Sequence, residues 1–301
     1  MNKTGTVIIN FTIGFGNNLF QYAYGRLLAE RNNMKLNHRA IPEINISESN
    51  TLVDTSLPTF FASEENYKKL LFADNFSSDR NIVVNGYFED FTLYESYLQE
   101  IRSWFPKIQK TNHSDLILHM RLQNRLIQEN HHKNHISPQG YIKGIEKFDF
   151  ERIHIVTDAE KWNHYDESDI EKIRYHVKNG PNPPSNSSWV SVERSMDYMN
   201  SLIDGFAKYE PIVHCNGAKM IKGSGGLRGG FIDDFNLISS FNKIMLYNST
   251  FSWWAALLSD ASKIGVFGPW KPRKHNCRNL GKTNYPGWFS WGTVEDLYWN
   301  V

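Results

Sequence analysis

The chain has 301 residues, of which 40% are hydrophobic and 14% aromatic, and 33 basic against 32 acidic residues give a net charge of +1. This composition suits one large or two medium globular domains, and the balanced charge argues against binding to nucleic acid or to an anionic membrane. The two cysteines, Cys215 and Cys277, exclude a disulfide framework and a cysteine-based metal cluster, and we expect free thiols. No segment reaches the roughly 18 apolar residues of a membrane span, and the first residues carry no apolar leader. We therefore expect a soluble, cytoplasmic protein.

The first third of the chain alternates strand and helix patterns. A strand is predicted at 7–11, a glycine-containing turn at 13–18, and a helix from Leu19 with apolar residues on most faces. Gly14 and Gly16 are spaced as in dinucleotide-binding turns, but the third glycine of that motif is missing from its place. We interpret the segment as a turn that brings backbone close to a ligand.

Further along, a strand pattern at 81–88 ends in a glycine turn, and a helix is predicted from Leu93 to Phe105, where Pro106 ends it. The polar segment 107–114 is the expected interdomain linker. The remaining strands are predicted at 115–118, 153–158, 244–247 and 263–267, and the helices at 141–148, 233–241 and from Phe251 onward. Alternating strands and helices predict an α/β fold with mostly parallel sheets.

Three segments are interpreted as loops. Residues 177–190 are rich in proline, asparagine and serine, and residues 223–230 are rich in glycine but lack the Lys-Ser/Thr ending of a phosphate-binding P-loop. The second of these is expected to close over a substrate. His131, His132 and His135 lie in a polar run without a nearby acidic partner, which favours a solvated loop over a metal site.

The segment 247–254 joins a strand to an amphipathic helix and carries residue types that cap helices. A strand that leads directly into a helix start is a favourable anion site, because unpaired N–H groups and the positive end of the helix dipole meet there. Trp254 shares the apolar stripe of Phe251 and Leu258, so we expect it to pack the helix onto the sheet. Trp253 lies off that stripe and is a candidate for contact with a ligand or with the other domain.

Polar residues follow the expected strand ends, where parallel α/β sheets bind ligands. The groups concerned are Gly14–Asn17, His119 with Arg121, Asp158, and Asn248–Ser252. Arg121 offers a planar fork suited to phosphate, and His119 points to the same side of its strand. Together with the helix start, these groups could hold a diphosphate without a metal ion.

Five segments, in order along the chain, resemble motifs of glycosyltransferase family 11, the α-1,2-fucosyltransferases. Gly14–Arg26 (GFGNNLFQYAYGR) is similar to that family's Gly-Leu-Gly-Asn-Gln-Leu-Phe-Gln-Tyr-Ala opening, and Gly86–Glu89 to its Gly-Tyr-Phe-Gln. His119–Arg121 falls where its His-x-Arg-Arg-Gly-Asp would be, and Thr157–Trp162 resembles Ser-Asp-Asp-x-x-Trp. Asn248–Ala256 (NSTFSWWAA) resembles its C-terminal motif.

The resemblance implies a GT-B-like fold, with two Rossmann-like domains facing across a cleft. Residues 1–110 would form the acceptor side and residues 111–301 the GDP-sugar-binding domain, with the C-terminal tail packing back on the first. It implies metal-independent, inverting transfer of fucose from GDP-fucose to a glycan hydroxyl, without a cofactor. The residues implied in binding the sugar nucleotide are Gly14, Gly16, Asn17, His119, Arg121, Asp158, Asn248, Ser249, Thr250, Phe251 and Ser252.

Catalysis would depend on His119 and Arg121, since charge grows on the leaving phosphate as the glycosidic bond breaks. The base that deprotonates the acceptor is open among Glu89, Asp90 and His119. Residues 122–124 are Leu-Gln-Asn where the family has Arg-Gly-Asp, so a second cation and a carboxylate are missing from their places. Another GDP-deoxyhexose as the substrate, or a catalytically silent glycan- or nucleotide-binding relative, therefore stays open, as do the acceptor and the oligomeric state.

Overall fold

The computed structural model describes residues 4–12, 14–73, 78–129, 135–179, 189–215, 230–247, 249–268 and 287–297. The chain forms two compact units that divide between Lys107 and Ile108, inside the segment predicted as a linker. The expectation that the C-terminal tail packs on the first domain concerns mainly residues outside the described ones. Which unit serves the acceptor, and whether the units face across a cleft, stay predictions.

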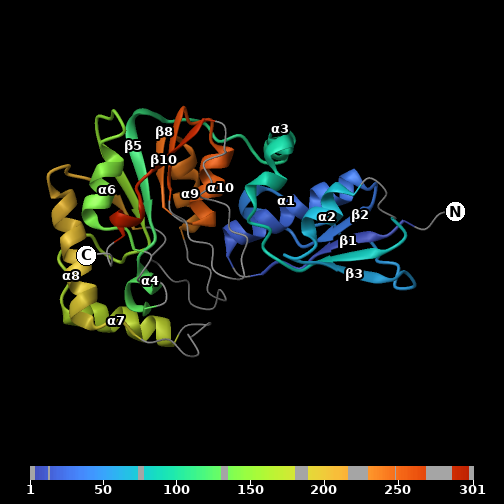
Figure 1. Ribbon diagram of the computed structural model, residues 1–301, viewed down its shortest axis with the longest axis horizontal. Helices are drawn as coiled ribbons and strands as arrows, with labels where there is room; N and C mark the ends of the chain where they lie inside the picture. The colour runs from blue at the N-terminus through green and yellow to red at the C-terminus, as the bar shows by residue number, and fades with distance from the viewer. Residues whose placement is uncertain are drawn as a thin grey trace. The chain divides into compact units, whose positions relative to one another are not determined.

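The first unit is built on a four-stranded parallel sheet of order β2-β1-β4-β3 (Figure 1). Its strands are β1 (Thr6–Ile9), β2 (Lys35–His38), β3 (Thr59–Ala62) and β4 (Asn81–Val84). Its helices are α1 (Phe15–Arg31), η1 (Pro42–Ile44), α2 (Tyr67–Phe72), η2 (Phe91–Leu93), η3 (Glu95–Tyr97) and α3 (Leu98–Ser103).

Helix α1 packs closely on this sheet through Gly25. A Cβ at Gly25 would lie 2.6 Å from the Ile9 side chain of β1 and 3.4 Å from Val84 of β4, so a larger residue would require the Ile9 side chain or the helix to shift. α1 begins at Phe15 rather than at the predicted Leu19, because Gly14 forms the N-cap at a φ of 103° that favours glycine. The helix predicted from Leu93 to Phe105 is divided into the short 3-10 helices η2 and η3 and the α-helix α3.

The second unit is built on a six-stranded parallel sheet of order β10-β9-β8-β5-β6-β7. Its strands are β5 (Asn112–Met120), β6 (Ile153–Thr157), β7 (Ile212–His214), β8 (Phe241–Leu246), β9 (Lys263–Phe267) and β10 (Trp288–Trp291). Read from β7, this is the strand order 3-2-1-4-5-6 of dinucleotide-binding α/β folds. In these folds, successive strands are added first on one side of strand 1 and then, from strand 4, on its other side. That change of side lies here between β5 and β8.

Helices cover both faces of this sheet, α6 and α8 on one side and α9 and α10 on the other (Figure 1). The helices are α4 (Gln123–Ile127), α6 (Pro138–Ile145), α7 (Glu167–Lys178), α8 (Val192–Ala207), α9 (Phe231–Ser239), α10 (Thr250–Leu258) and η5 (Val294–Asp296). Leu116, Leu118 and Met120 of β5 are buried in the core that includes residues of α6, α7 and α8. The two units confirm the predicted α/β class with parallel sheets.

Two of the predicted loops fall largely outside the described residues. Residues 180–188 and 216–229 are among those not described, and Gly230, which is described, is the N-cap of α9 with a φ of 83°. Residues 177–178, predicted as loop, belong to the end of α7. The loop prediction was wrong there because the helical pattern of α7 was not recognised.

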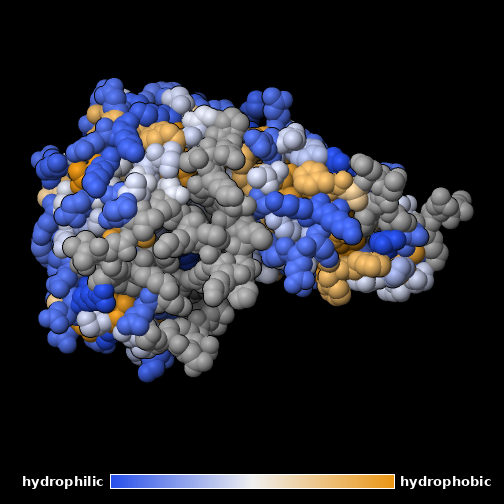
Figure 2. All heavy atoms as spheres, in the orientation of Figure 1, coloured by the Kyte–Doolittle hydropathy of each residue, from blue (hydrophilic) through white to orange (hydrophobic). Residues whose placement is uncertain are grey.

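The described surface is mainly polar. Figure 2 shows hydrophilic residues over much of the coloured surface on this face, with separate apolar groups among them. The exposed large apolar side chains include Phe60 and Phe61 on β3, which is an edge strand of the first unit. Within the described ranges, none of the helices has both the length and the apolar character needed to cross a bilayer.

Candidate functional site

The carboxyl ends of β5 and β8 form the topological switch point of the second unit, where open α/β sheets bind their ligands. His119 lies near the end of β5, and Arg121 follows the strand directly. From β8 the chain passes through Tyr247 into the start of α10 at Thr250. The structure thus brings the His119–Arg121 segment and the helix start, two segments singled out in the sequence, to neighbouring strand ends.

His119 is buried with 7% of its surface exposed, and in the described part of the chain its Nδ1 atom has no hydrogen-bond partner. Its ring lies 5.6 Å from the ring of Phe251 in the first turn of α10. Burial lowers the pKa of His119 to about 3; the charges of Arg121 and Arg125 also lower it, while Asp158 acts in the opposite direction. The imidazole is therefore neutral at physiological pH, and one of its ring nitrogens has no hydrogen-bond partner among the described residues.

Two arginines contribute positive charge to this edge of the sheet. Arg121 is exposed beyond the end of β5, as the sequence predicted. Arg125 of α4 was missed, because a five-residue helix gives no periodic signal. Its guanidinium carbon lies 4.8 Å from the centre of the Tyr247 ring, beyond the end of β8. The charges of two arginines therefore act on His119, where the sequence had indicated only one.

Asp158 follows β6 and binds the backbone that leaves β5. Its Oδ1 atom accepts the N–H of Leu122 at 2.5 Å and the N–H of Gln123 at 3.2 Å. The carboxylate thus fixes the turn between Arg121 and α4. This contact gives Asp158 a positioning role that the sequence did not reveal, and its contact with the nucleoside stays a prediction.

The start of α10 offers backbone donors. Ser249 is the extended N-cap residue, and its carbonyl accepts the N–H of Trp253 at 3.0 Å. In any α-helix the first turn leaves its N–H groups out of the helix's own hydrogen bonds, so the start of α10 and its dipole favour an anion. Within the described residues, the Ser249 side chain makes no capping hydrogen bond. Asn248 lies outside the described residues.

The side chain of Ser252 is not oriented for a ligand. It is fully buried, and its hydroxyl donates to the carbonyls of Tyr247 at 3.4 Å and Ser249 at 3.3 Å. The hydroxyl was expected to bind the sugar nucleotide, but it satisfies backbone acceptors at the helix start instead. Only the backbone N–H of Ser252 stays a candidate.

The two adjacent tryptophans both belong to the core. Trp254 is fully buried, as its place on the apolar stripe predicted. Trp253 is 3% exposed and packs edge-on against Trp288 of β10, with the ring centres 5.9 Å apart. The interpretation of Trp253 as a ligand contact was therefore wrong, because α10 is buried on more than its predicted stripe.

The glycine-rich candidate residues lie in the first unit, at the start of α1. Gly14 is the exposed N-cap, while Gly16 and Asn17 belong to the first turn of the helix. The carbonyl of Gly14 accepts the N–H of Asn18 at 3.0 Å. The segment is thus a helix start rather than the turn expected, and its part in binding stays a prediction.

Of the two acidic base candidates, Asp90 has a structural role. Its Oδ1 accepts the backbone N–H and the hydroxyl of Thr92, and its Oδ2 accepts the Tyr67 hydroxyl at 2.9 Å and pairs with Lys68 at 2.6 Å. Burial alone would raise the pKa of Asp90, but these partners lower it. Such a carboxylate holds a proton poorly. Glu89, which is 2% exposed, stays a candidate.

Metal ligands do not gather among the described residues, where no group of three or more histidine, cysteine, aspartate or glutamate side chains could hold a metal ion. His135 is 1% exposed and packs edge-on against Tyr198 at 4.7 Å, so it belongs to the core and not to a solvated loop. His131 and His132 lie outside the described residues.

Comparison with known proteins gives no family: no family model matches the chain, and no curated protein matches it. Among solved structures it is similar to NodZ α-1,6-fucosyltransferase soaked with GDP-fucose, with a TM-score of 0.41, 13% identity and coverage of 85% of this chain and 93% of that chain. A structure of fucosyltransferase NodZ from Bradyrhizobium gives a TM-score of 0.40, 13% identity and coverage of 85% and 94%. Similarity at this level assigns no activity.

Proposed function

We propose that this protein is an inverting, metal-independent glycosyltransferase that moves fucose from GDP-fucose to a glycan hydroxyl. The observation that carries the proposal is the buried, neutral His119 beside two arginines and the start of α10, at the switch point of a six-stranded parallel sheet. These are also segments whose residues resemble motifs of the α-1,2-fucosyltransferases. The resemblance supports GDP-fucose as the substrate and an α-1,2 linkage.

The site suits departure of a nucleoside diphosphate. When the bond between fucose and the β-phosphate breaks, its electron pair stays on the phosphate oxygen, and negative charge grows there. The guanidinium of Arg121 and the first N–H groups of α10 would stabilise that charge in place. Neutral His119 would donate a hydrogen bond from its ring to the departing phosphate, without transferring a proton to it.

The acceptor hydroxyl would attack the anomeric carbon from the opposite side, which inverts its configuration, and would lose its proton to a base. Asp90 is disfavoured by its ion pair with Lys68 and by its lowered pKa. His119 is disfavoured by a pKa of about 3. Glu89 is therefore our proposed base.

Calorimetric titration with GDP and GDP-fucose, in buffer with a metal chelator, tests the proposal first. We expect both to bind the wild type. A panel of GDP-sugars with a glycan array should then give fucosylated product, and linkage analysis distinguishes α-1,2 from α-1,6. Arg121→Ala should lower the transfer rate by about 10²- to 10³-fold, as loss of one charge-stabilising donor does in other enzymes.

The outcomes separate the alternatives. Transfer from a different GDP-deoxyhexose would show that the transferred sugar is not fucose, and the proposed mechanism would stay the same. Binding of GDP without release of product from any sugar nucleotide and glycan would identify a silent binding relative. No affinity for GDP in chelated buffer would refute the proposal.

A further inference from the structure

Position 122 cannot supply a charge to the site. Leu122 is 1% exposed and belongs to the core cluster that also contains Leu126 of α4. Its backbone is fixed as well, because its N–H donates to Asp158 and its carbonyl accepts the N–H of Leu126 at 2.7 Å. An arginine side chain here would be placed in the apolar core, where an unpaired charge is costly.

Arg125 places a guanidinium back at the switch point. Helix α4 starts at Gln123, directly beyond the end of β5 (Figure 1), and Leu122 and Leu126, one turn apart, are both buried. Arg125 is half-buried, and its guanidinium lies over the ring of Tyr247 at 4.8 Å. Tyr247 is the residue through which β8 continues toward α10, so the Arg125 side chain reaches from the helix after β5 to the end of β8.

The charge of Arg125 acts on His119. Arg121 and Arg125 both oppose protonation of His119, and Asp158 favours it. Two positive charges and one negative charge thus act on the imidazole, a sum of +1. The negative charge is partly satisfied already, because Asp158 accepts two backbone N–H groups. The balance of charge around His119 therefore favours an anion.

We propose that Arg125 is the second cation of the diphosphate site and binds the phosphates of the sugar nucleotide together with Arg121. This inference deepens the proposed function and rests on it for the identity of the nucleotide. Asp158 acts as a positioning residue, since it holds the turn that separates the two arginines. Leu-Gln-Asn at residues 122–124 then displaces the second cation along the chain rather than removing it.

The test uses the full chain and two probes, inorganic pyrophosphate and GDP, because pyrophosphate reports the phosphate site independently of the base. Arg125→Ala should weaken the binding of both by about 10- to 100-fold, the size of a lost charge-assisted hydrogen bond. Arg125→Met keeps a long apolar side chain over Tyr247 without the charge and should weaken binding equally. If Arg125→Ala folds poorly, this variant tests the role of the charge in its place. Arg125→Lys should recover most of the affinity.

A matched control is Arg174→Ala, which removes another half-buried arginine of the second unit, one that pairs with Glu171 at 2.7 Å on α7. It should leave both affinities unchanged. As a readout free of nucleotide, NMR titration should show a higher pKa for His119 in Arg125→Met than in the wild type. A structural role alone would not produce this shift.

The results separate the role of Arg125 from the identity of the bound nucleotide. If the wild type binds pyrophosphate but not GDP, and the Arg125 variants bind pyrophosphate more weakly, a GDP-sugar is refuted as the substrate. The role of Arg125 as the second cation is then supported. Unchanged affinities in Arg125→Ala and Arg125→Met, beside a clear loss in Arg121→Ala, would overturn the inference and leave the proposed function intact. If the wild type bound neither probe, both would fall.

Discussion

Two histidines of the second unit, His119 of β5 and His154 of β6, lie on the same face of the sheet but in opposite situations. The register pairs Ile117 with His154, so the side chains of His119 and His154 point to the same side. His119 has a ring nitrogen without a hydrogen-bond partner among the described residues, and cations surround it. Both ring nitrogens of His154 have partners.

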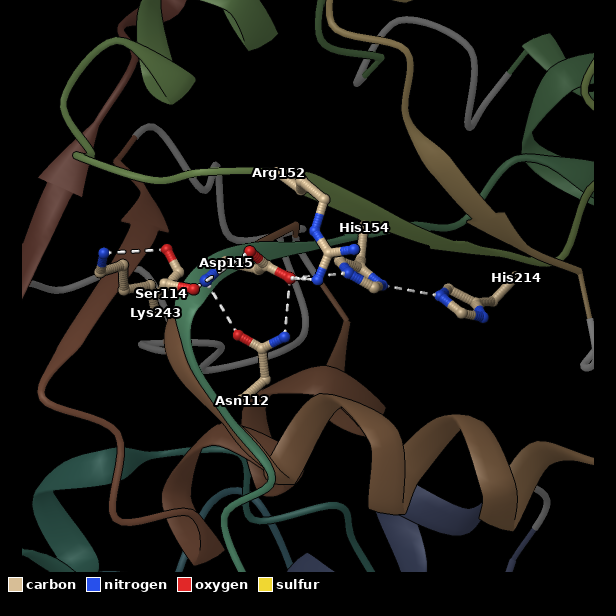
Figure 3. Close-up of polar contacts among 7 residues, drawn as sticks. All are labelled: Asn112, Ser114, Asp115, Arg152, His154, His214 and Lys243. Atoms are coloured by element: carbon tan, nitrogen blue, oxygen red, sulfur yellow. Dashed lines mark hydrogen bonds and ion pairs between the residues drawn. The ribbon is translucent and has the colours of Figure 1, made fainter.

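Figure 3 shows the closed network around His154. The Oδ2 atom of Asp115 lies 2.7 Å from Nδ2 of Asn112, 3.0 Å from Nη2 of Arg152 and 3.2 Å from Nε2 of His154. The Nδ1 atom of His154 lies 3.0 Å from Nε2 of His214. Burial alone would raise the pKa of Asp115, but its hydrogen bonds outweigh this effect and lower the pKa.

The difference shows how a structural histidine can be told from a ligand-binding one. A buried polar atom without a partner costs about 1–3 kcal/mol, and a network that satisfies every member contributes to stability. Asp115 and His154 complete each other's hydrogen bonds, so they need no ligand. His119 lacks one partner, and the charges near it favour an anion. The comparison predicts that variants of Asp115 and His154 mainly change stability, whereas variants of the site around His119 change ligand binding.

The largest expected effect on stability comes from Asp115→Ala. This change leaves half-buried donors of Asn112 and His154 without their buried acceptor and should lower the free energy of unfolding by about 2–4 kcal/mol. Urea denaturation measures the loss, and Asp149→Ala, at an exposed carboxylate, is the control. Affinity for GDP should stay unchanged under conditions where the variant is folded. A stable Asp115→Ala variant with lost GDP binding would reverse the roles of the two groups.

A somewhat smaller effect is expected on the pH dependence of stability through His119. Burial lowers its pKa from 6.5 in the unfolded chain to about 3 in the folded one, so both states are neutral above pH 6.5. As the pH falls, the unfolded chain takes up the proton first and stability is lost. Between pH 7.5 and pH 4.5 this contribution is about 2–3 kcal/mol. His119→Asn should lose less stability than the wild type by this amount over that range.

Denaturation of both proteins at the two pH values measures the difference. His164→Asn, at an exposed histidine, controls for substitution of the residue type. If the wild type and His119→Asn lose the same stability on acidification, the environment assigned to His119 is wrong.

The smallest expected effect comes from His214→Gln, at the outer end of the network. His214 is half-buried, and burial followed by the charge of His154 lowers its pKa. Glutamine can still form a hydrogen bond with His154, so the free energy of unfolding should change by less than about 1 kcal/mol. Thermal unfolding at pH 7.5 measures it. A loss as large as that of Asp115→Ala would show that the network depends on both histidines as a unit.

Local patterns predicted much of the second unit. The strands that end at His119 and Asp158, and the strand–helix junction before Phe251, were recognisable from apolar runs and capping residues. Because parallel strands share one carboxyl edge, their polar ends could be placed together before the structure was known. The start of α1 was predicted too late, since Gly14 and Gly16 are compatible with a turn as well as with a capped helix.

Features that depend on contacts between distant residues were not predicted. Arg125 gave no signal, because its position over Tyr247 follows from how α4 packs against α7 and α8. The network of Asp115, His154 and His214 joins three strands, and no residue spacing reveals it. The same holds for the ion pair that disfavours Asp90 as a base.

The most direct measurement follows the imidazole signals by NMR while GDP is added in metal-free buffer. His119→Asn identifies the signal of His119, and His154→Gln identifies that of His154. We predict that GDP shifts the His119 signal and raises its pKa, because the phosphates bring negative charge to the vacant ring nitrogen, while His154 stays unchanged. A shift of His154 with His119 unaffected, or no response from either, would contradict the assignment of the switch point as the diphosphate site.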